Sequence, residues 1–346
     1  MRRPDLHNIP NEVIEYIEYL ESLVPQKKSA NVRQLIETPP VIIPLAEEAP
    51  SASQIINISN LGFAKRTPRH LYIPQHRGGT GNPDLQIEQD DAQQLLSVIN
   101  EGDTLLLFTN FGRVFRLPSA RLEEKSNRQS GDWVWDRIEL QSSERIAAVL
   151  PVIAAGYIAM VTRTGRVRTL RHHLFGEHMR TGMSVFSPAE HGEFVSACWT
   201  NGDQDLLICT KNGMAIRFSE KLVPPMGDQA IRLSESDEVV SITAVYPESD
   251  VFTATADGRG SLRQMSGFSA NKSLGGGGKM LIKSDHVISS VAVKPDDHIF
   301  LLTKLGKVIR FPAAEMPVTD APVQGVNCIT LRGDEVISMI KSGRPE

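Results

Sequence analysis

The sequence predicts an all-β disc made of six repeated blades, because one short phrase returns six times along its 346 residues. Each copy consists of an apolar run, a Ser or Thr, two further residues and a glycine. The glycines that end the six copies are Gly62, Gly112, Gly165, Gly213, Gly258 and Gly306. Successive glycines are 50, 53, 48, 45 and 48 residues apart, and a period of this length is typical of repeat architectures.

The apolar runs predict strands that are buried on both faces. Leu105–Phe108 and Ile158–Val161 contain no polar position, and a strand without a polar face is covered on both sides. The Ser/Thr-x-x-Gly phrase that follows fits a tight hairpin turn in which the glycine supplies a positive φ. A second strand, such as Val114–Leu117, begins directly after the turn.

Each unit contains a further pair of short strands. Roughly 25 to 30 residues after the second strand, at the spacing of such a pair, another apolar run follows an acidic residue. These acids are Glu144, Asp237, Asp285 and Asp334. No segment with helical periodicity intervenes, so each blade is expected to have about four strands. Burial on both faces and repetition together predict blades that stack around an axis.

The first 53 residues differ from the repeats. We expect a helical segment over residues 1–36, a proline-rich linker over 37–53 and the six-bladed domain over 54–346. Asn11–Val24 places apolar residues on one stripe at helical spacing. An isolated helix of this length is only marginally stable in water, so its stripe should pack on something. It could dock on its own repeat domain or pair with a helix of a partner.

Composition limits the classes of function. An apolar content of 40% is typical of a soluble globular protein, and no apolar run is long enough to span a bilayer. The N-terminus lacks the features of a secretory signal, so we expect a cytoplasmic protein. The scattered Cys198, Cys209 and Cys328 predict free thiols in a reducing compartment. No metal or cofactor is expected.

Charge is nearly balanced in the repeats. The net charge is −4, and residues 54–346 hold all but five of the 37 Lys and Arg and all but eight of the 41 Asp and Glu. A nucleic-acid surface would therefore have to arise from the segregation of charges and not from an excess of basic residues.

An arginine recurs after the turn glycine. Arg66, Arg116, Arg217 and Arg310 lie four residues past it, Arg263 lies five past it, and the third unit has Arg166, Arg168 and Arg171 nearby. Two interpretations remain open for this series. The arginines could form inter-blade ion pairs or cover a solvated edge with their stems. Alternatively, each could contact a DNA phosphate once per blade.

The segment Gln75-His76-Arg77-Gly78-Gly79-Thr80-Gly81 surrounds a basic residue with glycines, which let a backbone approach a polyanion closely. It resembles the "gyrase A box", consensus QRRGGKG, in the first blade of the C-terminal domain of the bacterial DNA gyrase A protein. The repeats from about Gln54 to the end also resemble the blades of that domain. Further phrases that resemble the family are Phe108–Arg116, Thr210–Arg217, Asp237–Ile242 and Val323–Asn327.

This resemblance implies a six-bladed β-pinwheel whose blades exchange strands, with DNA bent around a basic rim. Gln75, Arg77, Gly78, Gly79 and Gly81 match the box, and His76 and Thr80 depart from it. A histidine at this place predicts tighter DNA binding below about pH 6.5 than above it. The glycine-rich stretch Leu274–Lys279 lacks the spacing of a phosphate-binding P-loop, and we interpret it as a degenerate counterpart of the box in the fifth unit.

The function that we expect is binding and wrapping of double-stranded DNA without sequence specificity, in the cytoplasm on the nucleoid. Arg77 and exposed backbone N–H groups of the box glycines would anchor the DNA, and further cations would contact its phosphates. The predicted DNA-binding residues are Gln75, His76, Arg77, Gly78, Gly79, Gly81, Arg66, Arg113, Arg116, Arg166, Arg168, Arg217, Arg263, Lys279, Lys307 and Arg310.

Two other classes of function remain as alternatives. The disc could be a protein-interaction module that docks to a type IIA topoisomerase through the Asn11–Val24 helix. A propeller-type hydrolase or lyase ranks last, because no carboxylate or metal constellation stands out. In the family, the cleavage tyrosine follows an arginine, and none of the five tyrosines here does. We therefore expect a non-enzyme that resembles the wrapping domain alone.

Overall fold

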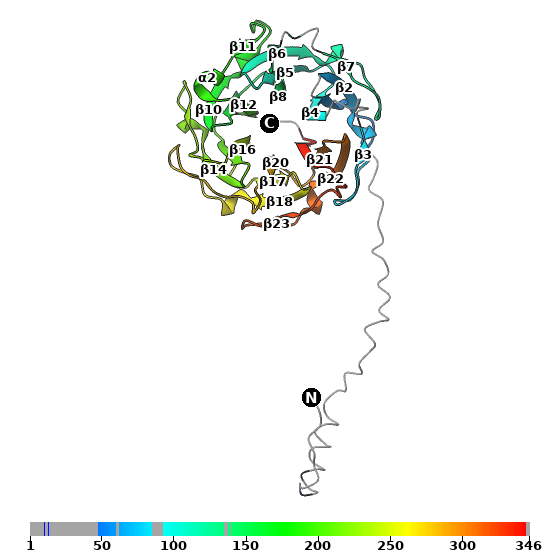
Figure 1. The fold of residues 1–346 in the computed structure, drawn as a ribbon, viewed down its shortest axis with the longest axis vertical. Coiled ribbons are helices and arrows are strands. Elements are labelled where there is room, and N and C mark those ends of the chain that lie inside the picture. The colour runs from blue at the N-terminus through cyan, green and yellow to red at the C-terminus, as the bar shows by residue number, and fades with distance from the viewer. Residues whose placement is uncertain are drawn as a thin grey trace. The chain divides into compact units, whose positions relative to one another are not determined.

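The structure is a computed structural model that describes residues 48–59, 62–84, 93–134, 138 and 140–343, together with Pro10 and Val13. The blades belong to one compact unit, Leu45–Glu346. The predicted helix Asn11–Val24, apart from Val13, and most of the predicted linker lie outside the described residues. The six-bladed all-β prediction is confirmed, because six small sheets form a ring around a central axis (Figure 1).

The two middle strands of each blade form the predicted hairpin. The first of the pair is, blade by blade, β1 (Ser53–Ser59), β5 (Thr104–Thr109), β9 (Tyr157–Thr162), β13 (Asp205–Thr210), β17 (Asp250–Thr255) and β21 (His298–Thr303). The second is β2 (Phe63–Pro68), β6 (Arg113–Pro118), β10 (Arg166–Arg171), β14 (Met214–Ser219), β18 (Arg259–Gln264) and β22 (Lys307–Pro312). All six turn glycines have positive φ, between 71° and 97°.

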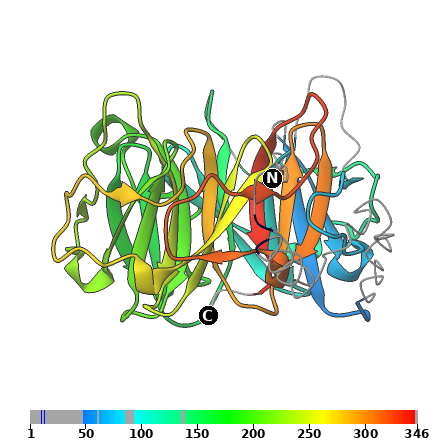
Figure 2. The same cartoon turned by 90° about the horizontal axis from the view of Figure 1, so that it is seen from below.

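The innermost strands surround the axis and run between the two faces of the disc (Figure 2). They are β4 (Gln93–Asn100), β8 (Ile146–Pro151), β12 (Phe194–Thr200), β16 (Val239–Val245), β20 (Val287–Val293) and β25 (Val336–Lys341). Four of them, β8, β16, β20 and β25, are the apolar runs that were expected behind an acidic residue. Within the described part of the ring, helix is confined to the four-residue α2 (Pro188–His191) and to short 3₁₀ turns.

Each unit gives its outermost strand to the preceding blade. These strands are β7 (Asp132–Trp133) on blade 1, β11 (Met183–Ser184) on blade 2, β15 (Asp228–Gln229) on blade 3, β19 (Lys279–Met280) on blade 4, and β23 (Val318–Thr319) with β24 (Val326–Asn327) on blade 5. Unit 1 gives β3 (Asn82–Pro83) to β22 of blade 6, which closes the ring. The strand exchange that the resemblance implied is therefore present.

A 3₁₀ turn precedes each outermost strand or pair. In chain order these turns are η1 (Arg69–Leu71), η2 (Ser119–Arg121), η4 (His172–Phe175), η5 (Glu220–Leu222), η6 (Met265–Gly267) and η7 (Ala313–Glu315).

The hydrophobic core lies between neighbouring blades. Along β5, Leu105 and Leu107 pack toward blade 1, whereas Leu106 and Phe108 pack toward blade 3. All four side chains are fully buried, as the unbroken apolar run predicted. Alternate residues of one strand thus serve two cores, which is why each blade requires its neighbours.

Candidate nucleic-acid interface

The box loop lies where unit 1 crosses to blade 6, directly before β3. Its backbone is fixed to unit 6 by three hydrogen bonds. The N–H of Gln75 donates to the carbonyl of Arg310 (2.7 Å), that of Gly78 donates to Cys328 (2.7 Å), and that of Thr330 donates to Gly79 (2.8 Å). The loop is therefore built into the ring and presents a defined surface at its outer edge.

The cation of the box is exposed and contacts neutral groups. Arg77 donates to the backbone carbonyls of Glu315 (Nε, 3.1 Å) and Asn327 (Nη1, 3.3 Å), so its positive charge is not cancelled by these contacts. The Glu315 carboxylate instead accepts from His76 Nδ1 (2.8 Å) and from the N–H of Arg77 (2.8 Å). The loop thus presents the Arg77 guanidinium as a possible phosphate contact, and it holds the Glu315 carboxylate close to this arginine.

The expectation of free N–H groups at the box glycines is wrong for two of them. Gly78 donates to Cys328, and Gly79 donates to His76 (3.2 Å). The glycines serve the docking of the loop. Gly78 and Gly81 have φ of 84° and 68°, and a Cβ on Gly81 would lie 3.2 Å from the carbonyl oxygen of Val308. Only glycine adopts such a conformation without strain.

Unit 5 contains a second loop with the same construction, so the interpretation of Leu274–Lys279 as a counterpart of the box is confirmed in geometry. The N–H of Asn271 donates to Arg217 (2.6 Å), that of Gly275 donates to Ala230 (2.9 Å), and that of Arg232 donates to Gly276 (2.9 Å). Gly275 and Gly278 have φ of 77° and 74°, close to the values of Gly78 and Gly81.

The second loop carries two exposed lysines, Lys272 and Lys279, and the exposed Arg232 of unit 4 lies beside it. Lys279 Nζ donates to the carbonyl (3.1 Å) and hydroxyl (2.5 Å) of Ser269, which are both neutral. Within the described part of the chain, none of the three cations forms an ion pair. Among the described residues, this loop therefore differs from the box, in which a carboxylate contacts a basic side chain.

Four of the recurring arginines hold the blades together. Arg66, Arg116, Arg217 and Arg310 occupy the same position in their hairpins, and each donates to a backbone carbonyl in or beside the 3₁₀ turn of the next unit. Arg217, for example, donates from Nη1 to Met265 (2.7 Å) and Phe268 (3.0 Å), and from Nε to Asp205 (2.8 Å). This arrangement favours the inter-blade interpretation of the series over repeated phosphate contacts.

Three of the arginines that were expected to contact phosphates are buried, so that expectation is wrong for them. Arg217, Arg263 and Arg310 are only 4%, 6% and 4% exposed, and their guanidinium groups face carbonyl oxygens inside the ring. Buried cations of this kind satisfy the carbonyls that adjoining units leave unpaired. A bound duplex would find no free surface on them.

The remaining predicted cations are only partly available. Arg66, Arg116, Arg166 and Arg168 each donate to backbone carbonyls, and Arg113 pairs with the buried carboxylate of Glu144 (2.7 Å). Lys307 lies on β22 opposite Pro83 of β3, so it shares the edge of the box loop.

Arg128 lies beside the same edge and was not expected from the sequence. This exposed residue has a φ of 67°, and its N–H donates to the carbonyl of Asp84, directly after β3. Unit 2 contains Lys125-Ser-Asn-Arg-Gln-Ser-Gly131, and the N–H of Lys125 donates to Arg66 (2.9 Å) as that of Gln75 does to Arg310. The glycine that ends each of these loops, Gly131 like Gly81, was the signal that could have revealed it.

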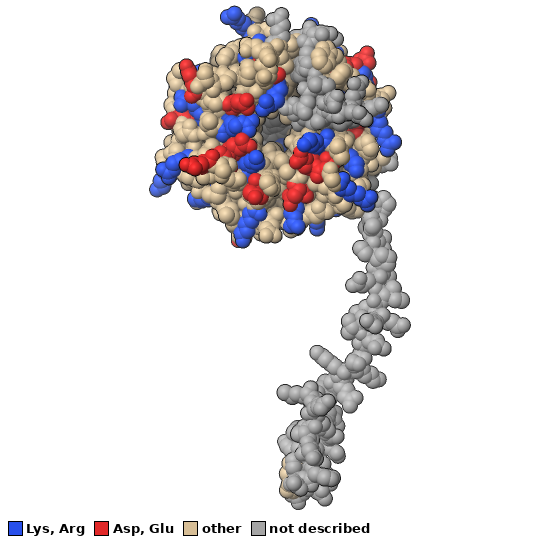
Figure 3. All heavy atoms as spheres, in the orientation of Figure 1, with Lys and Arg blue, Asp and Glu red and all other residues tan. Residues whose placement is uncertain are grey.

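Charges on one face of the ring are paired within and between blades. Glu193 contacts Arg145 (3.4 Å) and Arg163 (3.1 Å), and Glu238 contacts Arg163 (2.7 Å) and Lys211 (3.5 Å). Figure 3 shows Lys and Arg interspersed with Asp and Glu around the central opening. This pairing makes that face an unfavourable place for a polyanion.

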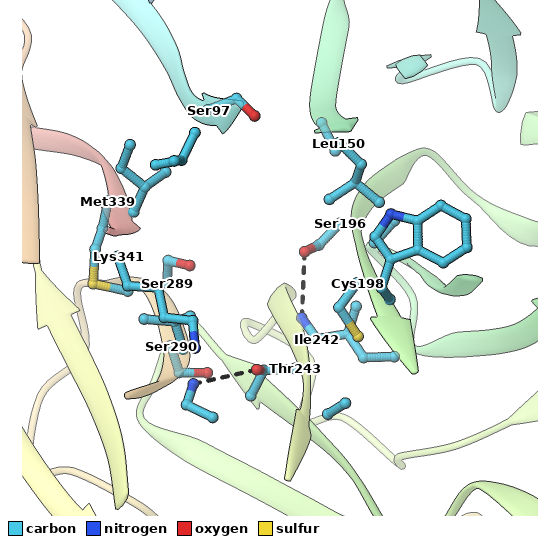
Figure 4. A pocket seen from close by; sticks show the side chains of 18 of the residues that line it. Ser97, Leu150, Ser196, Cys198, Ile242, Thr243, Ser289, Ser290, Met339 and Lys341 are labelled. Atoms are coloured by element: carbon cyan, nitrogen blue, oxygen red, sulfur yellow. Dashed lines mark hydrogen bonds between the residues drawn. The ribbon is translucent and has the colours of Figure 1, made fainter. Parts of the chain in front are cut away.

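A central channel of about 480 Å³ lies between the innermost strands, and its polar groups link them (Figure 4). The N–H of Ile242 donates to Ser196 Oγ (3.3 Å), and that of Ala292 donates to Thr243 Oγ1 (3.3 Å). Burial raises the pKa of the Cys198 thiol to about 12, which leaves it un-ionised at neutral pH. All three cysteines are free, as predicted.

In the parts of the chain that the structure describes, no group of three or more His, Cys, Asp or Glu side chains could hold a metal ion. Across those same residues, no helix is long and apolar enough to cross a membrane.

Comparison with known proteins identifies the repeats. Residues 54–97, 103–129, 204–245 and 297–342, in units 1, 2, 4 and 6, match the family "DNA gyrase C-terminal domain, beta-propeller". The DNA gyrase A protein of Mycolicibacterium smegmatis is 30% identical over 307 residues, which are 84% of this chain and 36% of that protein. The DNA gyrase A protein of Staphylococcus aureus strain MRSA252 is 28% identical over 84% of this chain and 34% of its own length. The chain thus spans about a third of these relatives.

Solved structures share the fold. The C-terminal domain of DNA gyrase A matches with a TM-score of 0.71 at 22% identity, covering 84% of this chain and 99% of that one. The C-terminal domain of DNA topoisomerase IV matches with a TM-score of 0.58 at 21% identity, covering 85% and 94%. Gyrase A relatives thus align along most of this chain, and four of its six units match repeats of the DNA gyrase A C-terminal domain family.

Proposed function

We propose that the ring binds double-stranded DNA along its outer edge without sequence specificity and bends it, and so affects DNA topology. The observation that carries this proposal is the pair of similarly built loops in units 1 and 5, which expose Arg77 and Lys279 at that edge. Similarity to a family known for DNA binding supports it. This function would place the protein on the nucleoid in the cytoplasm, as a non-catalytic module.

The path would use two groups of exposed or partly exposed cations. Arg77, Arg128 and Lys307 lie along the edge that β3 forms with blade 6, and Arg232, Lys272 and Lys279 lie around the second loop. Each phosphate contact contributes about −0.9 to the slope of log K against log salt, so six contacts predict a slope of about −5. None of these side chains is fixed in a way that would read base edges, so specificity should be low.

Bending a site of about 20 to 30 base pairs costs on the order of 1–6 kcal/mol, so both groups of cations must act together. A duplex that contacts only one group gains too little to remain bent. The proposal therefore predicts that short duplexes bind more weakly than duplexes long enough to reach both loops, and that deformable sequences are preferred.

A topology assay tests the proposal. A nicked circular plasmid is sealed by ligase in the presence of the full chain, and the linking number of the product is measured. A change in linking number supports wrapping, and the change should be lost in the Arg77→Ala/Lys279→Ala variant. Lys304→Ala is the matched control, because Lys304 is exposed but paired with Glu335 (2.8 Å). An unchanged linking number with the unmodified protein would overturn wrapping.

The second candidate is a disc that binds a type IIA topoisomerase and has little wrapping activity of its own. The charge pairing on one face and the exposed apolar side chains Trp133 (43%) and Met226 (75%) favour this candidate. Its test is the supercoil-relaxation rate of a type IIA topoisomerase with and without the chain. The Asn11–Val24 helix would be the contact, so a chain lacking residues 1–36 should lose any such effect.

A further inference from the structure

The ring closes at a seam between blade 6 and blade 1, the one joint at which the chain does not run directly from one unit into the next. Among the described residues, the hydrophobic cluster at this joint is the smallest, with seven buried residues against ten to fourteen at the others. Apolar burial contributes stability in proportion to the area removed from water. Polar contacts also cross the seam.

Buried polar groups supply those contacts. Arg310 of blade 6 donates from Nη1 to the carbonyls of Arg69 (3.2 Å) and Tyr72 (3.1 Å) in unit 1. Lys65 Nζ lies 3.1 Å from the Asp84 carboxylate, directly after β3, and the two side chains are 0% and 1% exposed. Breaking a buried ionic contact is costly, so these groups hold the seam only while every partner stays in place.

One of these partners is Glu48, which precedes the first blade. Its Oε1 accepts from Arg69 Nε (2.9 Å) and Nη2 (2.6 Å), and its Oε2 lies 2.5 Å from Arg310 Nη2. Arg69 also donates to the carbonyl of Ser342 at the end of the last unit (3.0 Å). A single carboxylate thus joins an arginine from each side of the seam.

The carboxylate occupies a defined pocket. A hollow of about 480 Å³ is lined by residues from both sides of the seam, among them Glu48, Arg69, Asp297, Arg310 and Ser342. Asp297 accepts from the N–H of Lys294 (2.9 Å) and lies 3.6 Å from Lys341, so it is engaged away from the arginines. Between Arg69 and Arg310, the anion among the described residues is Glu48.

We propose that this pocket is an oxyanion-binding site whose resident ligand is the Glu48 carboxylate, and that its occupancy latches the ring shut at the seam. Without an anion, Arg310 would be a buried cation facing Arg69, a pair of like charges that favours separation. The latch is connected to the box, because the N–H of Gln75 donates to the carbonyl of Arg310. A displacement of the segment before the first blade would therefore loosen the box loop together with the seam.

Hydrogen exchange of the full chain tests this proposal without DNA, so its outcome is independent of the proposed function. In Glu48→Ala, the amides of Gln75, Gly78, Asp84 and Thr330, which all donate across the seam, should exchange at least tenfold faster than in the unmodified protein. Sodium acetate should slow this exchange again, relative to sodium chloride at the same ionic strength. If Glu48→Ala does not fold, the exchange of the same amides is measured in the milder Glu48→Gln variant.

Asp205→Asn is the matched control. Asp205 pairs with Arg217 (2.8 Å), the arginine at the same register as Arg310, but in a joint that the chain crosses directly. This variant should leave the four seam amides unchanged. Unaltered seam exchange in the Glu48 variants, or accelerated exchange in Glu48→Ala that acetate does not slow, would overturn the proposal.

Discussion

Glu315 Oε1 lies 2.8 Å from Nδ1 of His76, and this contact places a negative charge inside the loop that we propose to bind DNA. A carboxylate within a few ångströms of a bound phosphate opposes binding by about 1 kcal/mol even in a watery environment. We therefore expect Glu315→Gln to bind a duplex of about 40 base pairs roughly fivefold more tightly at low salt. Fluorescence anisotropy of a labelled duplex measures the affinities of the variant and of the unmodified protein.

Asp285→Asn is the control for this first prediction, because Asp285 also contacts a histidine, His286 (3.5 Å), but in another unit. It should leave the affinity unchanged. Equal affinities for Glu315→Gln and the unmodified protein would show that the box loop does not meet the DNA backbone.

Arg217→Met should lower stability without altering the charge that DNA meets. It removes the donor to Met265 and Phe268 and leaves the Asp205 carboxylate without its partner. Removing one member of such a buried set costs about 3 kcal/mol. Denaturant unfolding should show this loss, and the salt slope of DNA binding should stay the same. A slope reduced by about 1 would instead mean that Arg217 contacts a phosphate.

The double variant Lys272→Ala/Lys279→Ala should weaken DNA binding and leave the stability of the fold nearly unchanged. Both lysines are exposed, so unfolding free energy should change by less than about 0.5 kcal/mol. The salt slope should fall by about 2, because two phosphate contacts are lost. Titrations at four salt concentrations measure the slope, with Lys304→Ala as the control that retains it. An unaltered slope in the double variant would remove the second loop from the DNA path.

Acid should weaken the joint between blades 3 and 4. Burial raises the pKa of the Glu238 carboxyl, but hydrogen bonds from Arg163 and the charges of Arg163 and Lys211 outweigh this and hold the pKa below its ordinary 4.5. The stabilisation is therefore complete above pH 4.5 and is lost as the pH falls through the lowered value. Glu238→Gln should have a lower Tm at pH 7 and a smaller further loss in acid.

Calorimetry between pH 7 and pH 3 tests this expectation. The curves of Glu238→Gln and the unmodified protein should converge in acid, where both side chains are neutral. Glu235→Gln, at an exposed position without an ion pair among the described residues, should follow the unmodified protein. A constant difference in Tm across the range would contradict the role given to the Glu238 charge.

Local features of the blades could be predicted from the sequence. The turn at Gly213 was expected from its neighbours, and its φ of 75° agrees. The run Leu105–Phe108 was expected to be buried on both faces, and all four of its side chains are fully buried. Both signals are local, because backbone sterics and side-chain periodicity act within a few residues. The glycine spacing of loops 75–81 and 271–278 was also visible for this reason.

The partners of the arginines could not be predicted in the same way. Arg310 and Lys279 are both cations that follow a turn or loop glycine, yet one is buried against Tyr72 and the other is exposed beside Ser269. The difference depends on which carbonyls the next unit brings to each strand. The outermost strands are only two residues long, so they have no periodicity that a sequence could reveal.

The sequence by itself determined six units, their buried strands and their turns, because each of these follows from residues that are neighbours in the chain. Only the tertiary structure decided which cations face water and where the ring closes. The Glu48 carboxylate meets Arg310 across more than two hundred residues of chain, and whether such a charge is free or neutralised depends on groups that only folding brings together.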